Sequence, residues 1–280
     1  MSLDVDNILS IAIEAAKNAS KWLREVQEEE EYSDLVRLSE EDVTRKFDVE
    51  AERIIIDVFI RDHVNAVFVS EELGVKSTSE NPEYIVVIDP LDGSNNYVAN
   101  IPYAAVSVAI SKFRRNATLN DIFVGVVSEV FRDNIYYAIK GHGAYENQVK
   151  LKKPRNIGKP FILGYLNYES YDVFKELEKI FGPFKLRSLG SASLDIIYVA
   201  KSAAGLFLDL RSKLRNVDVA AALLILKEAG GKAKSYHLNL ANVSICNVEK
   251  ILSIAAFSKE WSVRYEETVD NIVNKVFKRK

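Results

Sequence analysis

The segment 84–97 constrains the fold more than any other stretch of this chain. It begins with five apolar or aromatic residues and continues as Asp89-Pro-Leu-Asp92-Gly-Ser-Asn-Asn-Tyr. A short, β-branched apolar run favours a buried strand over a helix. Proline has no N–H to donate to a sheet, so the strand is predicted to end at Pro90. Asp89 and Asp92 are therefore expected on a sharp turn at the end of this strand.

The residues of this turn are suited to a metal-bound phosphate. Gly93 permits a positive φ angle or a close approach of the backbone to a ligand. Ser94 and Asn95 are good helix N-cap residues. The carboxylates can hold a hard cation, and the N–H groups at a helix start can bind phosphate oxygens. The alternative is an ordinary turn, since Asp-Gly is a common turn pair. Carboxylates elsewhere in the chain favour the phosphate site.

Composition excludes several classes of function. The chain has 280 residues, of which 48% are hydrophobic and 28% charged, as in a soluble globular protein. Its formal net charge of −3 gives no electrostatic basis for binding nucleic acid or an anionic membrane. One cysteine, Cys246, excludes an internal disulfide and a Cys-rich zinc site. The chain has neither a signal-peptide pattern nor an apolar run of membrane-spanning length. We therefore expect a cytoplasmic protein.

Two helices are predicted in the first quarter of the chain. Helical spacing of apolar residues predicts an amphipathic helix over 4–28, and the polar stretch 32–47 is predicted to be a loop. Asp48 can cap a second helix. Glu50 and Glu52 lie in its first turn, where acids interact favourably with the positive end of the helix dipole. As a plain N-cap, Asp48 needs no further role. A supporting role in catalysis is the alternative.

A second pair of acids follows the short apolar strand predicted at 66–69. Glu71 and Glu72 stand just past its end. Adjacent side chains point in different directions, so at most one of the two is expected to reach a shared metal. A solvated turn is the alternative for this pair.

Residues 152–160 are predicted to be a linker because they combine charge with turn-forming residues. They divide the chain into an α+β subdomain, 1–155, and an α/β subdomain, 156–280. Before the linker, strands are predicted at 103–113, 122–130 and 135–139. After it, strands are predicted at 161–166, 184–187, 205–210 and 252–257, and helices at 173–181, 191–200, 217–229 and 261–277.

Asp218 stands at the start of one of these helices, followed by a run of alanines that permits close packing. Alone it would be an ordinary first-turn acid. Together with Glu71, Asp89 and Asp92 it is the fourth carboxylate at the end of an element, and the four could converge. All-oxygen ligands favour Mg²⁺ or Mn²⁺ over zinc. Two such ions can generate hydroxide and stabilise the leaving oxygen in phosphate hydrolysis.

Other mechanisms fit the sequence less well. The three histidines, His63, His142 and His237, lack the spacing of a zinc site. The chain contains no Gly-x-Ser-x-Gly elbow and no Walker lysine motif. Haloacid dehalogenase-type phosphatases have Asp-x-Asp, whereas here the spacing is three and a proline intervenes. This difference favours metal ligands and a water nucleophile over a phospho-aspartate.

Three motifs in order resemble the inositol monophosphatase superfamily of Mg²⁺-dependent, lithium-sensitive phosphatases. They are Glu71-Glu72, then Asp89-Pro-Leu-Asp92-Gly-Ser, then Asp218 before an Ala-rich helix that ends in Glu-Ala-Gly-Gly. The chain is most similar to the archaeal branch that acts on fructose 1,6-bisphosphate and inositol monophosphate, which also lacks the Trp usual before the last aspartate. The resemblance implies an α+β fold layered as an α-β-α-β-α sandwich, and a homodimer, with a tetramer as the alternative.

The resemblance also implies roles for individual residues. Two to three Mg²⁺ ions, with Mn²⁺ as the alternative, would be bound by Glu71, Asp89, the carbonyl of Leu91, Asp92 and Asp218. Ser94 would hydrogen-bond Asp48, and this pair would help Glu71 to activate the attacking water. The N–H groups of Gly93 and Ser94 would hold the scissile phosphate. The 32–47 loop would help to place a third, weaker metal.

Substrate choice depends on basic residues in the second half. Arg187 and Arg211 match positions that line the sugar site in archaeal relatives, and Asp92 and the Ala192 N–H would also contact substrate. Arginine is suited to bidentate phosphate binding. A second phosphate held there would make fructose 1,6-bisphosphate a better substrate than an inositol phosphate. The alternative is that each arginine is a surface or ion-pair residue.

The predicted function is therefore Mg²⁺-dependent hydrolysis of a sugar phosphate, with fructose-1,6-bisphosphatase and inositol-1-phosphatase as the expected activities. Two alternatives remain open. A phosphatase of 3′-phosphoadenosine 5′-phosphate has the same metal motif. A regulator could bind sugar phosphates without turning them over.

Overall fold

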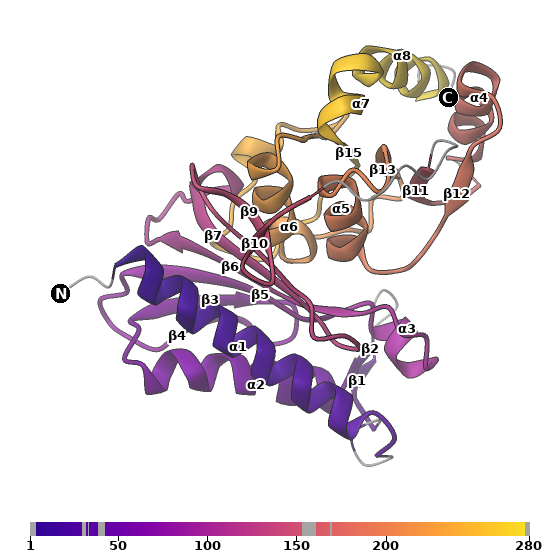
Figure 1. The fold of residues 1–280 in the computed structure, drawn as a ribbon. Coiled ribbons are helices and arrows are strands. Elements are labelled where there is room, and N and C mark those ends of the chain that lie inside the picture. Colours follow the sequence, from indigo (N-terminus) through magenta and orange to yellow (C-terminus); the bar gives the residue numbers. More distant parts are fainter. Residues whose placement is uncertain are drawn as a thin grey trace.

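The computed structural model describes residues 4–29, 32, 34–38, 43–152, 161–168 and 170–277. Helices and sheets alternate in five layers, which confirms the predicted α-β-α-β-α arrangement (Figure 1). The helices of the first layer are α1 (Val5–Val26) and α2 (Lys46–Arg61), and those of the third are α5 (Ala192–Ala200) and α6 (Asn216–Glu228). The helices of the fifth layer are α4 (Tyr171–Phe181), α7 (Lys259–Arg264) and α8 (Glu266–Phe277). None of the helices within these described ranges has the length and apolar character needed to cross a membrane.

The first sheet has eight strands in the order β10-β9-β8-β7-β6-β5-β3-β4. Neighbouring strands are antiparallel except for β3 and β5, which are parallel. Helices α1 and α2 cover one face, and every residue of β5 is buried. The strands are β3 (Ala66–Ser70), β4 (Gly74–Ser77), β5 (Tyr84–Asp92), β6 (Ala105–Lys112), β7 (Ile122–Glu129), β8 (Ile135–Ile139), β9 (Gly143–Glu146) and β10 (Val149–Lys150).

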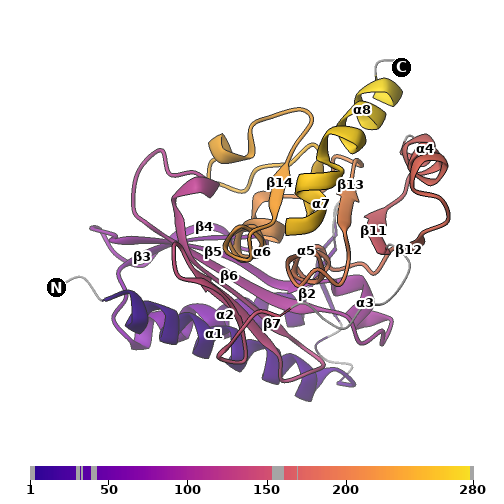
Figure 2. The same cartoon turned by 45° about the horizontal axis from the view of Figure 1, so that its top comes forward.

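The second sheet has five strands in the order β12-β11-β13-β15-β14. Because β12, β11 and β13 are parallel, their carboxyl ends lie at one edge, where crevices that bind ligands usually form. Figure 2 shows α5 and α6 between the two sheets. The strands are β11 (Phe161–Tyr165), β12 (Lys185–Arg187), β13 (Leu206–Asp209), β14 (Lys232–Lys234) and β15 (Ile254–Phe257).

The predicted boundary between 1–155 and 156–280 falls within 153–160, which lies outside the described residues. The eight-stranded sheet precedes this point in sequence and the five-stranded sheet follows it. One hydrophobic cluster combines residues of the first sheet, α5, α6 and the second sheet. The two halves of the chain therefore share a core.

Helix α6 packs very closely on β7. A Cβ atom added to Gly125 would lie 2.8 Å from the carbonyl oxygen of Ala221 and 3.1 Å from its Cα. Residues 220–222 are alanines and all are buried. Glycine facing alanine lets helix and strand backbones touch, as the alanine run led us to expect. This contact fixes the position of α6 and thus of Asp218 in its first turn.

Strand β5 does not end at Pro90, as predicted, but continues to Asp92. Asp89 pairs with Ser107 of β6 and Asp92 pairs with Ala105. Between these two pairs β5 advances by three residues and β6 by only two. The extra residue makes a bulge that accommodates a proline without an N–H to donate. The bulge bends the strand just where its two aspartates stand.

Two predicted helix starts are also wrong. Helix α2 begins at Lys46, and Asp48 is its third residue, whose Oδ2 accepts a hydrogen bond from the backbone N–H of Arg45 at 2.9 Å. An acid at this third helical position completes a capping box, because its carboxylate accepts the N–H of the N-cap residue. Helix α3 (Ser94–Val98) is capped by Gly93, whose φ is 94°. Gly93 thus adopts the positive φ that glycine permits, whereas Ser94 is the first helical residue and not the N-cap.

Other differences are smaller. The predicted 32–47 loop contains a hairpin of β1 (Leu35–Leu38) and β2 (Val43–Arg45), since strands this short leave little signal in a polar stretch. The last predicted helix is interrupted at Tyr265, between α7 and α8. Ser191, the first residue of the helix predicted at 191–200, is the N-cap of α5 and accepts a hydrogen bond from the N–H of Leu194.

Candidate metal centre and active site

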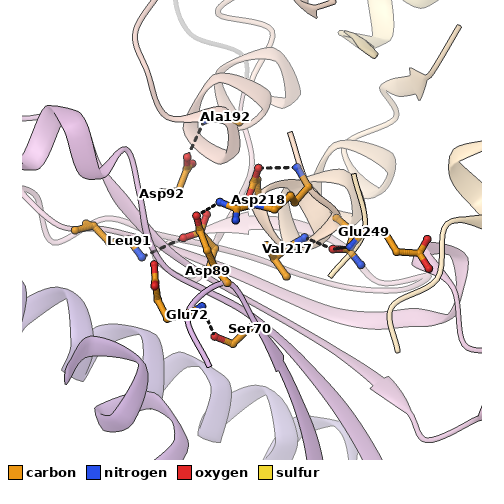
Figure 3. Close-up of polar contacts among 12 residues, drawn as sticks. Ser70, Glu72, Asp89, Leu91, Asp92, Ala192, Val217, Asp218 and Glu249 are labelled. Carbon is orange, nitrogen blue, oxygen red and sulfur yellow. Dashed lines mark hydrogen bonds and ion pairs between the residues drawn. The ribbon is translucent and has the colours of Figure 1, made fainter. Parts of the chain in front are cut away.

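Three of the four predicted carboxylates meet. Glu71, Asp89 and Asp218 each offer an oxygen, and these oxygens all lie within 4.8 Å of one another. The fold explains the meeting, because β3 and β5 are parallel neighbours and therefore deliver Glu71 and Asp89 at adjacent positions. Helix α6 brings Asp218 from the second half of the chain (Figure 3). We call these three residues the carboxylate group.

The electrostatics of the carboxylate group favour a bound cation. Burial is the largest cause that raises the pKa of Asp89 well above its ordinary value, and the charge of Glu71 is the next. The charges of Asp92 and Asp218 raise the pKa of Asp89 further. Buried carboxylates this close repel one another unless a proton or a cation lies among them. Oxygen ligands alone suit a hard divalent ion such as Mg²⁺ or Mn²⁺.

Asp92 is directed toward Ala192 at the start of α5 (Figure 3). Its Oδ2 accepts hydrogen bonds from the hydroxyl of Ser191 at 2.6 Å, from the backbone N–H of Ser193 at 2.7 Å and from the Ser193 hydroxyl. Its Oδ1 accepts the N–H of Ala192 at 3.0 Å. One lone pair of Oδ1 therefore remains available to an ion. The ligand role of Asp92 stays a prediction that requires this oxygen.

The remaining predicted residues stand around the same turn. The N–H of Leu91 donates to Asp89 Oδ1 at 3.1 Å. A Cβ on Gly93 would lie 3.0 Å from the carbonyl oxygen of Tyr103, so both conformation and space require glycine there. Asp48 Oδ2 accepts the N–H of Arg45. Its hydrogen bond with Ser94 stays a prediction.

Comparison with known proteins identifies the family. Residues 4–265 match the sequence profile of the inositol monophosphatase family. The chain belongs to this family. It is 31% identical over 230 residues to a protein of Methanothermobacter thermautotrophicus named fructose-1,6-bisphosphatase/inositol-1-monophosphatase, covering 79% of this chain and 81% of that one.

Two further comparisons concern sequence and fold. A bifunctional NADP phosphatase/NAD kinase of Methanococcus maripaludis is 28% identical over 288 residues; the match covers 92% of this chain but only 50% of that protein. A Pyrococcus horikoshii protein, described as having similarities for inositol-1 monophosphatase, superposes with a TM-score of 0.78 at 27% identity. That match covers 97% of this chain and 98% of the other, so the inositol monophosphatase fold is shared throughout.

The two arginines that the family resemblance singled out differ in their surroundings. Arg211 makes a two-point ion pair with Asp209, with distances of 3.0 Å from Nε to Oδ1 and 2.8 Å from Nη2 to Oδ2. Its guanidinium also lies 4.2 Å from the centre of the Tyr165 ring. Arg187 is exposed and donates to the carbonyl of Leu186 at 2.7 Å. Arg211 is thus held rigidly, whereas Arg187 is a surface residue in this structure.

Sequence reasoning missed Arg215, whose side chain extends into the carboxylate group. Its Nη2 donates a hydrogen bond to Glu71 Oε1, and its Nε lies 3.9 Å from Asp218 Oδ1. Its backbone N–H donates to Asp218 Oδ2 at 2.8 Å. The signal available in the sequence was an arginine at the N-cap position, three residues before an acid.

Sequence reasoning also missed the burial of Glu52, which was expected only as an acid in the first turn of a helix. Glu52 is fully buried, and burial raises its pKa. The Ser70 hydroxyl donates to its Oε2, and the same hydroxyl accepts the N–H of Glu72 at 3.2 Å. Helix α2 thereby holds the turn that carries Glu71. The signal was the spacing of Glu52 four residues after Asp48, which puts both on the buried face.

A buried acid in α5 gives a prediction about pH. Tyr103 donates a hydrogen bond to Asp195 Oδ1 at 2.9 Å, and burial raises the pKa of Asp195 to about 8. The unfolded chain loses this proton near pH 4, so from there to about pH 8 Asp195 lowers the free energy of unfolding by up to about 1.4 kcal/mol per pH unit.

Asp195→Asn removes this dependence. The free energy of unfolding of the variant minus that of the unmodified protein should increase by about 2–4 kcal/mol from about pH 5 to about pH 8. Urea unfolding at the two pH values measures the gain. An equal stability difference at both would contradict a raised pKa at Asp195.

Proposed function

We propose that this protein is a divalent-metal-dependent phosphomonoesterase that acts on fructose 1,6-bisphosphate and inositol 1-phosphate. The observation that carries the proposal is the convergence of Glu71, Asp89 and Asp218 from three elements. Packing three acids together destabilises a fold unless a proton or positive charge offsets their repulsion, and such clusters are typical of functional sites. The name of the Methanothermobacter relative, fructose-1,6-bisphosphatase/inositol-1-monophosphatase, supports this choice of substrates.

The chain's own residues supply binding and orientation. Two to three Mg²⁺ or Mn²⁺ ions would be held by the carboxylate group, with Asp92 Oδ1 and the Leu91 carbonyl as further oxygens. Bound there, such ions lower the pKa of an attacking water and offset the charge of the phosphate. The N–H groups of Gly93 and Ser94, at the start of α3, would orient the phosphate oxygens. Glu71 would take the proton from the water, supported by Ser94 and Asp48.

A second candidate function is hydrolysis of a nucleotide's ribose phosphate. The Methanococcus relative, named for NADP phosphatase as well as NAD kinase activity, matches 92% of this chain. Within this reading, 3′-phosphoadenosine 5′-phosphate is the other nucleotide substrate to consider. A regulator without turnover is less well supported, because without a bound cation the three acids would repel a phosphate, and with one they would hold the groups that hydrolysis needs.

Phosphate release distinguishes these functions. The panel is fructose 1,6-bisphosphate, inositol 1-phosphate, NADP and 3′-phosphoadenosine 5′-phosphate, each with Mg²⁺ and with EDTA. We expect Mg²⁺-dependent release from the first two. Release from the nucleotides alone would support the second candidate. Binding of sugar phosphates without any release would support the regulator and overturn the proposal.

Removing Arg211 tests whether a second phosphate is bound. Arg211→Ala is expected to lower kcat/KM for fructose 1,6-bisphosphate by about tenfold to a hundredfold, the loss of a charge-assisted pair. The loss for inositol 1-phosphate should be much smaller. Arg187→Ala tests the second arginine in the same assay, and Arg264→Ala, an exposed arginine of α7 near Glu260, is the control. Equal losses on both substrates would contradict a role in binding a second phosphate.

A further inference from the structure

Arg215 is placed so that its backbone and its side chain act on different acids. The backbone N–H caps α6 by donating to Asp218 Oδ2 at 2.8 Å. The guanidinium extends to Glu71 and leaves Nε 3.9 Å from Asp218 Oδ1. It is also close enough to Asp89 to lower the pKa of that carboxyl, against the larger effects of burial and neighbouring acids. One positive charge therefore acts on all three members of the carboxylate group.

The bond to Glu71 uses an oxygen that an ion would need. A guanidinium and a divalent cation are both positive and repel each other at this range. Both also seek the lone pairs of the same carboxylate. The Arg215 side chain has a relative exposure of 26% and that of Glu71 15%, so the pair lies at the rim of the group and is not sealed inside it. The side chain can leave Glu71 while the backbone cap on Asp218 stays in place.

Resting on the metal site proposed above, we propose that Arg215 is the internal counter-cation of the carboxylate group and competes with the divalent ion for Glu71. The guanidinium offsets the repulsion among the acids, which stabilises the fold. An ion that takes Glu71 as a ligand must first displace the guanidinium. Arg215 therefore lowers the affinity for that ion and, by the same competition, reduces the stabilisation that the ion adds to the fold.

Calorimetric titration with Mn²⁺ tests the competition without measuring activity. Arg215→Gln keeps the backbone N–H that caps Asp218 but removes the charge. We expect it to bind Mn²⁺ about tenfold more tightly than the unmodified protein, a change of about 1.4 kcal/mol. Arg215→Lys keeps a charge without the planar fork and should lie between the two. Arg61→Gln, a surface arginine paired with Glu14, is the control and should bind like the unmodified protein.

Thermal unfolding in EDTA and in saturating Mn²⁺ separates competition from a purely structural role. Arg215→Gln should unfold at a lower temperature than the unmodified protein in EDTA, and Mn²⁺ should abolish or reverse the difference. The same loss in both conditions would overturn the proposal, as would unchanged or weaker Mn²⁺ binding by a folded Arg215→Gln protein. If the unmodified protein binds no Mn²⁺, the proposed metal site fails first, which distinguishes the two failures.

Discussion

Asp89→Asn is expected to lower kcat by about a thousandfold or more, because loss of a central metal ligand removes several kcal/mol of transition-state stabilisation. The substitution is nearly isosteric. Its Oδ1 can still accept the N–H of Leu91, which donates to Asp89 at 3.1 Å. The turn should therefore survive, and the loss should come from the missing charge alone.

The same substitution should stabilise the protein when metal is withheld. Because the pKa of Asp89 is raised in the fold, mainly by burial, its ionisation opposes folding from about pH 4 upward. Asn cannot ionise, so in EDTA near neutral pH the midpoint temperature should rise by at least about 3 °C, roughly 1 kcal/mol for a chain of this size.

Phosphate release and calorimetric unfolding measure the two effects of Asp89→Asn. Asp133→Asn, an exposed acid paired with Arg24, is the matched control and should change neither. Mg²⁺ should raise the midpoint of the unmodified protein and of the control, but not that of Asp89→Asn. Retained turnover would contradict the ligand role, and a lower midpoint in EDTA would contradict the raised pKa.

Asp92→Ala should be the most destabilising single change near the site, at about 3–5 kcal/mol. Asp92 accepts two backbone N–H groups and two serine hydroxyls at the start of α5. Alanine would leave these buried donors without an acceptor and remove a negative charge from the positive end of a helix. The loss would also weaken the contact between the two halves of the chain, because Asp92 lies in β5.

Urea unfolding gives this free energy from the midpoint and the slope. Asp121→Ala is the matched control: Asp121 accepts the N–H of Thr118 at 2.9 Å in a short, half-buried 3-10 turn, and its removal should cost about 1 kcal/mol. Asp92→Asn keeps the shape and one acceptor and should fall between the two. If Asp92→Ala were no worse than Asp121→Ala, the hydrogen bonds to α5 would not hold the fold together.

The family resemblance implied the layered fold, and the sequence indicated that Glu71, Asp89 and Asp218 could converge with Asp92; the first three do. Each of these acids ends a strand or begins a helix, and such positions follow from local pattern. The path of β5 could not be predicted, because the bulge at Pro90 depends on pairing with β6. Proline was taken as a stop signal, and pairing across the sheet overrode it.

The orientation of Asp92 lies beyond local pattern for a different reason. Its partners are 99 to 101 residues away in sequence, and nothing near Asp92 shows that α5 will present its N–H groups there. Arg215 was overlooked because its charge matters only once Glu71, 144 residues away, is beside it. Glu52 was placed in a first turn for its effect on the helix dipole, and its burial depends on Ser70 of β3, 18 residues away. In each case tertiary contacts decided the outcome.

The close packing of α6 on Gly125 of β7 is needed to place a metal ligand, even if the chain could fold without it. Any side chain larger than hydrogen at 125 would press against the backbone at Ala221 and push the helix outward. Asp218 would be carried with it, although no acid had been altered. A protein can therefore keep every sequence motif of a hydrolase and still be inactive, because a larger residue has displaced this helix from the sheet. The residue at position 125 should be checked before activity is assigned to such a sequence.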